Sequence, residues 1–584
     1  MNTAVALVLT TGLVLAACGT DDDATDDAST EADEAAEESG DADGRAGDDA
    51  EFDAGAEMEM EEEAMEEEAS DDSSEEPADD GSGQIDAGIP SSPADAEGEF
   101  DDAAADRDEA ADETSGGGLF DEGAEGDAEG RFDDNRFADY GYRDFVSVAR
   151  DPLSTFALDV DTGSYTVGRR FIDEGALPPR ESVRPEEYIN AFDYDYATPR
   201  SGLELSVDGG PSPFDSDNVL VRIGVQGEVV ADEDRGPAAL TFVIDTSGSM
   251  DRDDRLGLVK ESLEILVDEL DGDDTVAIVT YSDSSGIVLE PTPVRDRDRI
   301  LDAIDALGPG GSTNLESGLR EGYALAREGF DPDGINRVVL ASDGVANAGV
   351  TDPDELARML RDDADAGIDL VTVGFGMGNF NDITMEQLAD NGDGFYAYVD
   401  TRDEAERLFE DELTSTLLTI AKDAKIQVEF APAVVVSYRL FGFENRVVRD
   451  SDFDNDDVDA GELGAGHQVT AIYELELADG VSLNDRAELG VAALRWEDPD
   501  TGNVTEVDED IDTRDIDERF SDTADDFQLA TVVAVFAEKL RDNPYADDVD
   551  MIDLSEEADR LSSVFDSEDV DELSELIADA AMRL

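Results

Sequence analysis

The chain has 584 residues, with 39 Lys and Arg against 154 Asp and Glu, and its formal net charge is −115. A surface this negative repels a phosphate backbone, which argues against nucleic acid as a partner. The length is sufficient for two or three domains with cores of their own, and the single cysteine, Cys18, excludes an intramolecular disulfide.

The basic residues are almost all arginine. The lysines are Lys260, Lys422, Lys425 and Lys539. An acid-rich, lysine-poor surface predicts a halophilic adaptation, because salt screens the repulsion between like charges.

Residues 1–18 have the pattern of a lipoprotein signal peptide. The apolar run AVALVLTTGLVLAAC ends at Cys18 and has the length of a signal-peptide hydrophobic region. Its last four residues are similar to a bacterial lipobox, which implies lipidation of Cys18. The usual basic residues are missing between Met1 and Ala4, so either the true start lies upstream or the signal is atypical. An apolar N-terminus with a stray cysteine is the alternative.

Residues 19–140 consist mainly of Asp, Glu, Ala, Gly and Ser. Such a segment cannot bury enough apolar surface to offset its chain entropy, so we predict a disordered region. Like charges repel one another and favour an extended acidic tether. The later sequence contains no run apolar enough to span a bilayer, so we expect an extracytoplasmic protein that the lipid on Cys18 anchors to the cell membrane.

Order is expected to begin near Arg143. The region 141–236 contains two predicted helices, in SYTVGRRFIDEG and RPEEYINAF, and two predicted strands, Leu203 to Val207 and Val219 to Val225.

The region 237–420 alternates strands with helices. This is the pattern of an α/β fold with a doubly wound, mostly parallel sheet, covered by helices on both faces. The predicted strands are Leu240 to Ile244, Thr275 to Tyr281, Gly286 to Glu290, Arg337 to Ala341, Asp369 to Gly374 and Gly394 to Val399. The predicted helices are Arg255 to Leu270, Asp298 to Leu307, Asn314 to Arg327, Pro353 to Ala366, Thr384 to Asn391 and Arg402 to Leu418.

The region 421–518 is predicted to be β-rich and sandwich-like, and the region 519–584 to be a C-terminal helical segment. Alternation such as AIYELEL predicts an antiparallel sheet with one solvated face. We further predict that strands before and after the region 237–420 form one sandwich into which the α/β module is inserted.

The first strand of the α/β module ends in an oxygen-rich loop, DTSGS. Asp245, Ser247 and Ser249 are hard oxygen donors at alternate positions, and Gly248 gives the backbone room to turn. Such donors suit a small divalent cation that retains some of its water. The motif is short, so its meaning depends on the rest of the chain.

Two later stretches supply that context. GPGGSTN places Ser312 and Thr313 at the start of a helix, and VVLASDG places Asp343 directly after a buried strand. Ligands of open α/β sheets bind at the carboxyl ends of strands, where the strand order reverses. The expected metal ligands are Asp245, Ser247, Ser249, Thr313 and Asp343, with one position open for water or an outside carboxylate. Ser312 in place of Thr313 is the alternative, since hydroxyls at helix starts are often only N-caps.

This pattern resembles the von Willebrand factor A (VWA) family and its metal-ion-dependent adhesion site (MIDAS). The resemblance implies that Ser247 and Ser249 contact Mg²⁺, or another divalent cation such as Mn²⁺ or Ca²⁺, directly. Thr313 would contact it directly or through water, and both acids largely through water. The flanks PLSTFALDVDTGSYTVGRRFIDEGALPP and DFQLATVVAVFAEKLRDNPY are similar to bacterial YfbK-type VWA lipoproteins.

The resemblance implies a binding protein, with no catalytic residues, whose ligand is a protein presenting an acidic side chain. A metal-dependent hydrolase and a structural envelope protein stabilised by the metal are the alternatives. GPGGST lacks the lysine of a phosphate-binding loop, which argues against a nucleotide ligand. His467, the only histidine, is predicted to lie in a surface loop without a catalytic partner.

Overall fold

The computed structural model describes residues 135–584 apart from 159, 232–234, 333, 345–348, 350–352, 365, 378–379, 457, 500 and 566. The predicted signal peptide, Cys18 and nearly all of the acidic tether lie outside the described residues. No helix among the described residues is long and apolar enough to cross a membrane.

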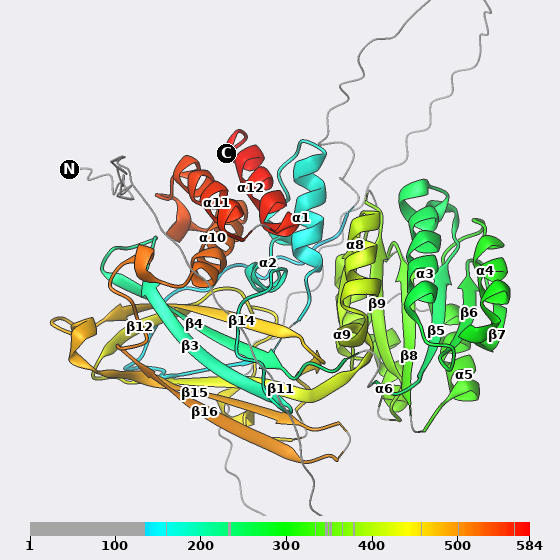
Figure 1. Cartoon of the computed structure of the whole chain (residues 1–584), viewed down its shortest axis with the longest axis horizontal. Helices are drawn as coiled ribbons and strands as arrows, with labels where there is room; N and C mark the ends of the chain where they lie inside the picture. The colour runs from blue at the N-terminus through cyan, green and yellow to red at the C-terminus, as the bar shows by residue number, and fades with distance from the viewer. Residues whose placement is uncertain are drawn as a thin grey trace, which may run out of the picture. The chain divides into compact units, whose positions relative to one another are not determined.

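The α/β module is built on a sheet with the strand order β10-β9-β8-β5-β6-β7 (Figure 1). Neighbouring strands are parallel except for β6 and β7, which are antiparallel. This confirms the predicted mostly parallel sheet. The strands are β5 (Ala238–Asp245), β6 (Thr275–Tyr281), β7 (Ser285–Pro293), β8 (Ile335–Ser342), β9 (Asp369–Phe375) and β10 (Tyr396–Val399). The helices are α3 (Leu258–Glu269), α4 (Arg297–Asp305), α5 (Leu315–Gly329), α6 (Pro353–Ala364), α7 (Asp382–Asp390), α8 (Arg402–Glu406) and α9 (Leu413–Leu417).

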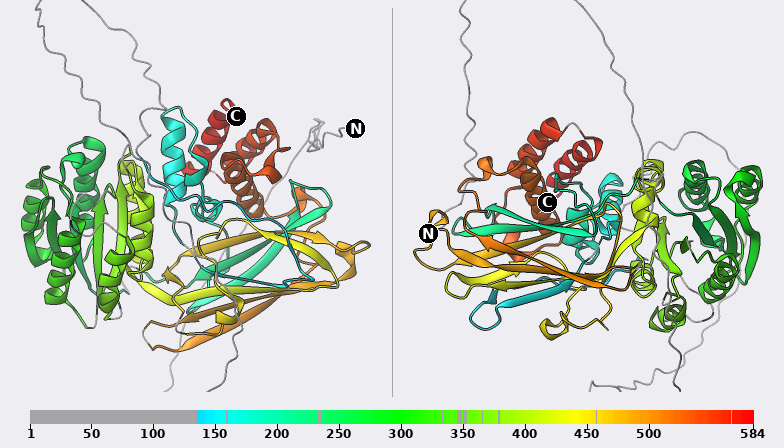
Figure 2. Two further views of the ribbon diagram at one scale, coloured as in Figure 1. Left: turned by 180° about the vertical axis from the view of Figure 1, so that it is seen from behind. Right: turned by 60° about the horizontal axis from the view of Figure 1, so that its bottom comes forward.

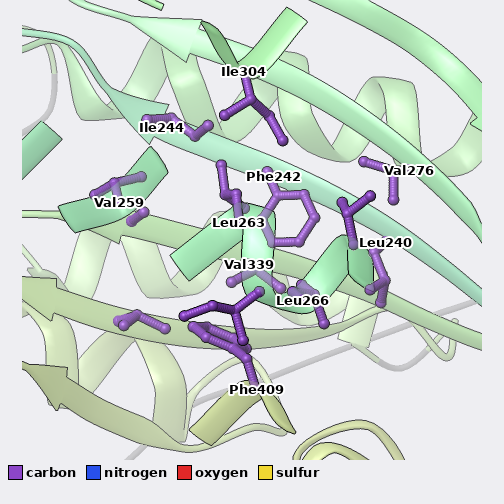
Figure 3. Close-up of a cluster of buried hydrophobic side chains, with 14 of the residues drawn as sticks. Leu240, Phe242, Ile244, Val259, Leu263, Leu266, Val276, Ile304, Val339 and Phe409 are labelled. Carbon is purple, nitrogen blue, oxygen red and sulfur yellow. The ribbon is translucent and has the colours of Figure 1, made fainter. Parts of the chain in front are cut away.

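Helices cover both faces of this sheet because its central strands are apolar on both sides. Successive side chains of a strand point to opposite faces. Phe242 of β5 therefore packs on one face with Leu263 of α3 (Figure 3), whereas Val243 packs on the other face with Leu319 of α5. The predicted doubly wound arrangement is confirmed.

The remaining strands form two sheets that lie face to face (Figure 2). One has the order β1-β12-β14-β4-β3, and the other the order β13-β11-β15-β16, with β2 also paired to β11. Antiparallel pairing of β4 with β14 and of β2 with β11 joins strands from before and after the α/β module. The predicted insertion into one sandwich is therefore confirmed. The strands are β1 (Val146–Ser147), β2 (Leu153–Ala157), β3 (Leu203–Pro211), β4 (Asn218–Gly227), β11 (Thr419–Phe430), β12 (Val435–Leu440), β13 (Gly461–Gly464), β14 (Gln468–Leu477), β15 (Glu488–Glu497) and β16 (Val504–Asp512).

The expectation of one solvated face is wrong for the sheet that contains β14. Leu220 and Ile472 point away from the sandwich core and pack with helices on the outer face. Glu474, on the same strand, is 1% exposed and accepts a hydrogen bond of 2.9 Å from Arg439 Nη2. A covering helical layer therefore buries the polar positions of the alternating pattern. The helices outside the α/β module are α1 (Gly163–Asp173), α2 (Pro185–Asn190), α10 (Asp525–Leu540), α11 (Met551–Phe565) and α12 (Glu568–Ala581).

Candidate metal centre

The strand order of the α/β sheet reverses between β5 and β8, and each of these strands leads into an acid. Asp245 is the last residue of β5, and Asp343 directly follows β8. Both residues are 0% exposed. The two buried acids thus lie at the carboxyl ends of the strands, at the reversal of strand order, where open α/β folds bind ligands.

The loop after β5 holds the first three predicted donors together. Ser247 N donates a hydrogen bond to Asp245 Oδ1 at 2.7 Å, and the hydroxyl oxygens of Ser247 and Ser249 are 2.9 Å apart. Ser342, which the sequence analysis did not single out, donates to Asp245 Oδ2 at 3.1 Å. Asp245 thereby links the loop to the end of β8.

The glycine-rich loop packs against this first loop through its backbone. Gly248 N donates to Gly311 O at 3.0 Å, and Gly310 N donates to Thr246 O at 2.6 Å. Gly311 has a φ of +87°, and an added Cβ would lie 3.0 Å from Ser282 Oγ, so glycine is required here.

The two neighbouring hydroxyls, Ser312 and Thr313, differ in their surroundings. Thr313 is 1% exposed. Ser312 is exposed, and its Oγ donates to Asp283 Oδ1 at 2.7 Å. The two hydroxyls therefore differ in burial: Thr313 is enclosed, whereas Ser312 is exposed and bonded to Asp283.

Electrostatics at this edge favour a cation. Burial, together with the negative charge of Asp343, raises the pKa of Asp245 to about 7. Arg255 Nη1 donates to Asp343 Oδ2 at 2.8 Å and to Ser249 O at 3.0 Å. With both acids ionised, the two carboxylates and the guanidinium sum to a charge of −1, and a divalent cation would change the sum to +1. The hard oxygen donors and the unbalanced negative charge of this buried group fit a divalent cation. Once the cation is bound, the site would be positive and would attract a carboxylate from outside.

Sequence reasoning missed Arg255, which it treated only as the first residue of a helix. In the structure a π-helical turn over Asp253–Gly257 precedes α3 and brings the guanidinium, 3% exposed, to the two loops. The pairing with Asp343 joins residues 88 positions apart, so no local pattern signals it.

A second acidic group lies elsewhere in the described part of the chain. Carboxylate oxygens of Asp393, Asp459 and Glu462 lie within 4.8 Å of one another. Burial and neighbouring carboxylates raise the pKa of Asp459 to about 7. Lys422 Nζ already donates to Asp393 Oδ2 at 2.9 Å, so an internal cation balances part of this charge.

His467 lies in the loop between β13 and β14, as predicted, but the residue is half-buried and lines a cavity of about 220 Å³. His467 Nδ1 accepts a hydrogen bond of 3.0 Å from Gly464 N, and the ring meets Phe395 edge-on with centroids 5.9 Å apart. Burial lowers the pKa of His467 to about 4, so the imidazole is neutral at pH 7.

Three family models match the chain in succession. A von Willebrand factor model matches residues 131–222, the von Willebrand factor type A domain matches residues 239–411, and the C-terminal domain of the uncharacterized protein YfbK matches residues 415–582. The uncharacterized protein YfbK of Escherichia coli (strain K12) is 36% identical over 434 residues, which cover 70% of this chain and 75% of that protein. The chain belongs to the YfbK family of VWA proteins.

Matches outside the YfbK family are more partial. The uncharacterized protein sll0103 of Synechocystis is 29% identical over 212 residues, which cover 36% of this chain and 49% of that protein. Inter-alpha-trypsin inhibitor heavy chain H3 of Mesocricetus auratus is 24% identical over 267 residues, which cover 42% of this chain and 29% of that protein. A solved von Willebrand factor type A structure from Catenulispora acidiphila matches with a TM-score of 0.39 and 16% identity, covering 65% of this chain and 89% of that one.

Membership of the VWA family bears on function at a general level. VWA domains mediate protein–protein interactions, are generally not enzymes, and commonly bind a divalent metal ion. These general properties of VWA domains support a role for this YfbK-family chain in binding other proteins.

Proposed function

We propose that this chain is an extracytoplasmic lipoprotein, anchored to the membrane through Cys18, that binds an acidic group of another protein through a divalent cation on its VWA domain. The metal ligands would be Asp245, Ser247, Ser249, Thr313 and Asp343. The observation that carries the proposal is the convergence of two fully buried acids with hydroxyl groups at the edge where the strand order reverses.

Each residue has a part in this proposal. The Ser247 and Ser249 hydroxyls, 2.9 Å apart, would hold the ion directly, with Thr313 beside them or one water away. Asp245 and Asp343 would anchor its water ligands and supply negative charge. Arg255 fixes Asp343, and its positive charge would leave the ion-bound site with a net positive charge that attracts a partner carboxylate. Recognition would proceed by coordination, without turnover.

The first test is the variant Asp245→Ala. We expect Mg²⁺ binding, measured by calorimetry, to weaken about 10–100-fold, as when a group that orients metal ligands is lost. Circular dichroism should show that the fold is kept. The matched control is Asp251→Ala, which removes an exposed acid from the same loop and should leave the affinity unchanged. Wild-type affinity in Asp245→Ala would contradict the proposed metal site.

A pull-down experiment distinguishes a metal that binds a partner protein from a metal that only stabilises the fold. The full chain is used to pull down proteins from envelope extract, with and without EDTA. We expect a captured protein that EDTA releases and that Asp245→Ala fails to capture. If chelation lowers the melting temperature but releases nothing, the metal only stabilises the module.

A further inference from the structure

The cavity that His467 lines has walls from three parts of the described chain. One wall belongs to the α/β module and comes from β10, the π-helical turn over Arg407–Asp411 and α9. The second comes from the residues before α1 and after α2, and the third from the loop between β13 and β14. One water needs roughly 10–15 Å³ of such volume, so a cavity of about 220 Å³ has room for a small organic molecule.

Hydrogen bonds between the three parts hold these walls in place. Tyr396 N of β10 donates to Asp161 Oδ1, before α1, at 2.8 Å. Tyr194 N, after α2, donates to Gln468 Oε1 of β14 at 2.8 Å. These bonds pre-form the cavity, which lowers the cost of ordering its walls when a ligand binds.

The lining of the cavity carries more negative than positive charge. It contains two acids, Asp193 and Glu412, and one guanidinium, that of Arg407. Arg407 Nη1 donates to Glu412 Oε1 at 2.6 Å, and its Nη2 pairs with Glu404. Asp193 is exposed, and none of the described residues forms a hydrogen bond or ion pair with its carboxylate. The one arginine is therefore shared between two other acids, and the charge of Asp193 is left without a cation.

His467 contributes a hydrogen-bond donor to the same cavity. Its Nδ1 accepts from Gly464 N at 3.0 Å and the ring is neutral, so the ring proton resides on Nε2. The part of the chain that the structure describes offers no acceptor to this Nε2. The edge-on contact with Phe395 fixes the orientation of the ring. A ligand that fits the cavity should therefore carry an acceptor as well as a positive charge.

Apolar side chains also line the cavity, and they come from all but the sandwich wall: Val160, Phe192, Phe395, Ala397 and Leu408. Phe192 and Leu408 are 5% and 4% exposed. A hydrated inorganic ion would lose water against these side chains without gaining ligands. The apolar part of an organic molecule would instead gain free energy from the contact.

We propose that this cavity binds a small organic molecule with a primary ammonium group, a hydrogen-bond acceptor and an apolar body. The ammonium would pair with Asp193, the acceptor would receive the Nε2 proton of His467, and the apolar body would contact Phe192 and Leu408. None of the residues that line the cavity is one of the five expected metal ligands. The inference therefore does not depend on the proposed function.

The ring of His467 reports on the cavity, because the chain has no other histidine. Leucinamide is the probe, since it has an ammonium, a carbonyl and an apolar side chain. It is titrated at pH 6 into the full chain labelled with ¹³C at histidine, in molar NaCl to screen loose association with the acidic surface. We expect the NMR signal of the ring to shift until the site is saturated. N-acetyl-leucinamide, which lacks the charge, should bind about 10–100-fold more weakly. A ring signal that leucinamide does not shift would overturn the inference.

A matched pair of variants provides the second test. Asp193→Asn removes the proposed partner of the ammonium, whereas Asp195→Asn removes an exposed acid that does not line the cavity. Calorimetry should show that the affinity for leucinamide falls about 10–100-fold in Asp193→Asn and is unchanged in Asp195→Asn. Equal affinities in the two variants would overturn the inference, and equal melting temperatures would show that both keep the fold.

The source of the ammonium group can be read from a longer probe. Leucyl-glycyl-glycinamide begins with the same residue as leucinamide but continues as a peptide. Affinity equal to that of leucinamide would support a site for the N-terminus of a peptide. Weaker binding of the longer probe would support a site for a free small molecule.

Discussion

Arg255 joins three parts of the candidate site through one buried side chain. Its guanidinium donates to Asp343, to the backbone of the first loop and to Met377 O. We predict that Arg255→Met lowers the free energy of unfolding by about 3–5 kcal/mol, because the Asp343 carboxylate stays buried without this guanidinium.

Urea unfolding of the metal-free protein measures this loss. The control is Arg252→Met, whose side chain is 50% exposed and pairs with Asp254 at 2.8 Å on the surface. Exposed pairs contribute little, so the control should lose less than about 1 kcal/mol. Equal losses in the two variants would contradict the role assigned to Arg255.

His467 provides a pH-dependent prediction. Burial lowers its pKa from 6.5 to about 4. Between these values the unfolded chain binds a proton that the folded protein does not, so the contribution of His467 to stability is complete above about pH 6.5. It is lost as the pH falls towards 4, at a rate of at most about 1.4 kcal/mol per pH unit.

The variant His467→Gln isolates this contribution, because the chain has one histidine. Urea unfolding is measured for both proteins between pH 7 and pH 4. We expect the wild type to lose more stability than the variant on acidification, so the difference between them should shrink. Parallel pH profiles would show that the ring is protonated equally in both states.

For individual residues, the sequence predicted the candidate metal ligands but not the side chains that hold those ligands in place. Asp245, Ser247, Ser249, Thr313 and Asp343 could be named because each follows a strand or precedes a helix, and the topology brings such positions to one edge. Whether they hold a metal stays a prediction. The contacts of Arg255 and Ser342 depend on long-range packing, which the local pattern does not contain.

Among the elements, α5 is the helix that follows the glycine-rich loop of the candidate site. It begins two residues after Thr313 and packs on β5, where a Cβ added to Gly322 would lie 2.3 Å from Val243 Cγ2. Alanine favours a helix over glycine by about 1 kcal/mol. We nevertheless predict that Gly322→Ala lowers the free energy of unfolding by about 1–3 kcal/mol, because the helix is forced away from the sheet.

A double-mutant cycle tests the cause. Val243→Ala removes the obstructing methyl groups, so the loss in the double variant should be smaller than the sum of the two single losses. Gly308→Ala is the control, because a Cβ there has nothing within 4 Å. Additive losses would mean that Gly322 does not act through its contact with β5.

The predicted helix from Arg402 to Leu418 shows why element boundaries were harder to obtain than element types. The structure divides it into α8, a π-helical turn over Arg407–Asp411 and α9. Arg407 pairs with both Glu404 and Glu412 across this break. Buried apolar residues continue through the π-helical turn at helical spacing. The hydrophobic pattern therefore predicted one continuous helix and gave no sign of the break.

At the scale of the whole molecule, several arginines of the described chain form buried ion pairs. Arg235, Arg184 and Arg439 have side chains 2%, 4% and 0% exposed, and each pairs with a buried acid. Such pairs leave fewer cations to offset the acids on the surface. The net charge of −115 should therefore act mainly as surface repulsion, which salt can screen.

The edge strand β16 carries a run of exposed acids. Asp508, Glu509 and Asp510 are exposed and lie opposite Ala493, Ala492 and Val491 of β15, so their cross-strand neighbours are uncharged. Acids along an edge also discourage pairing with other chains. At low salt they should repel one another and weaken the edge.

We predict that the melting temperature of the wild type rises from 10 mM to molar NaCl, as the Debye length falls from about 30 Å to about 3 Å. Changing the acids at 508–510 to Asn, Gln and Asn should raise the low-salt melting temperature by about 2–4 °C, as expected for about 1 kcal/mol, and leave the molar-salt value unchanged. The control changes Glu506 and Asp456, which pair with Arg495, and should give no gain. A gain that persists in molar salt would mean that the acids act through something other than charge. A wild-type melting temperature that does not change with salt would contradict the predicted halophilic adaptation.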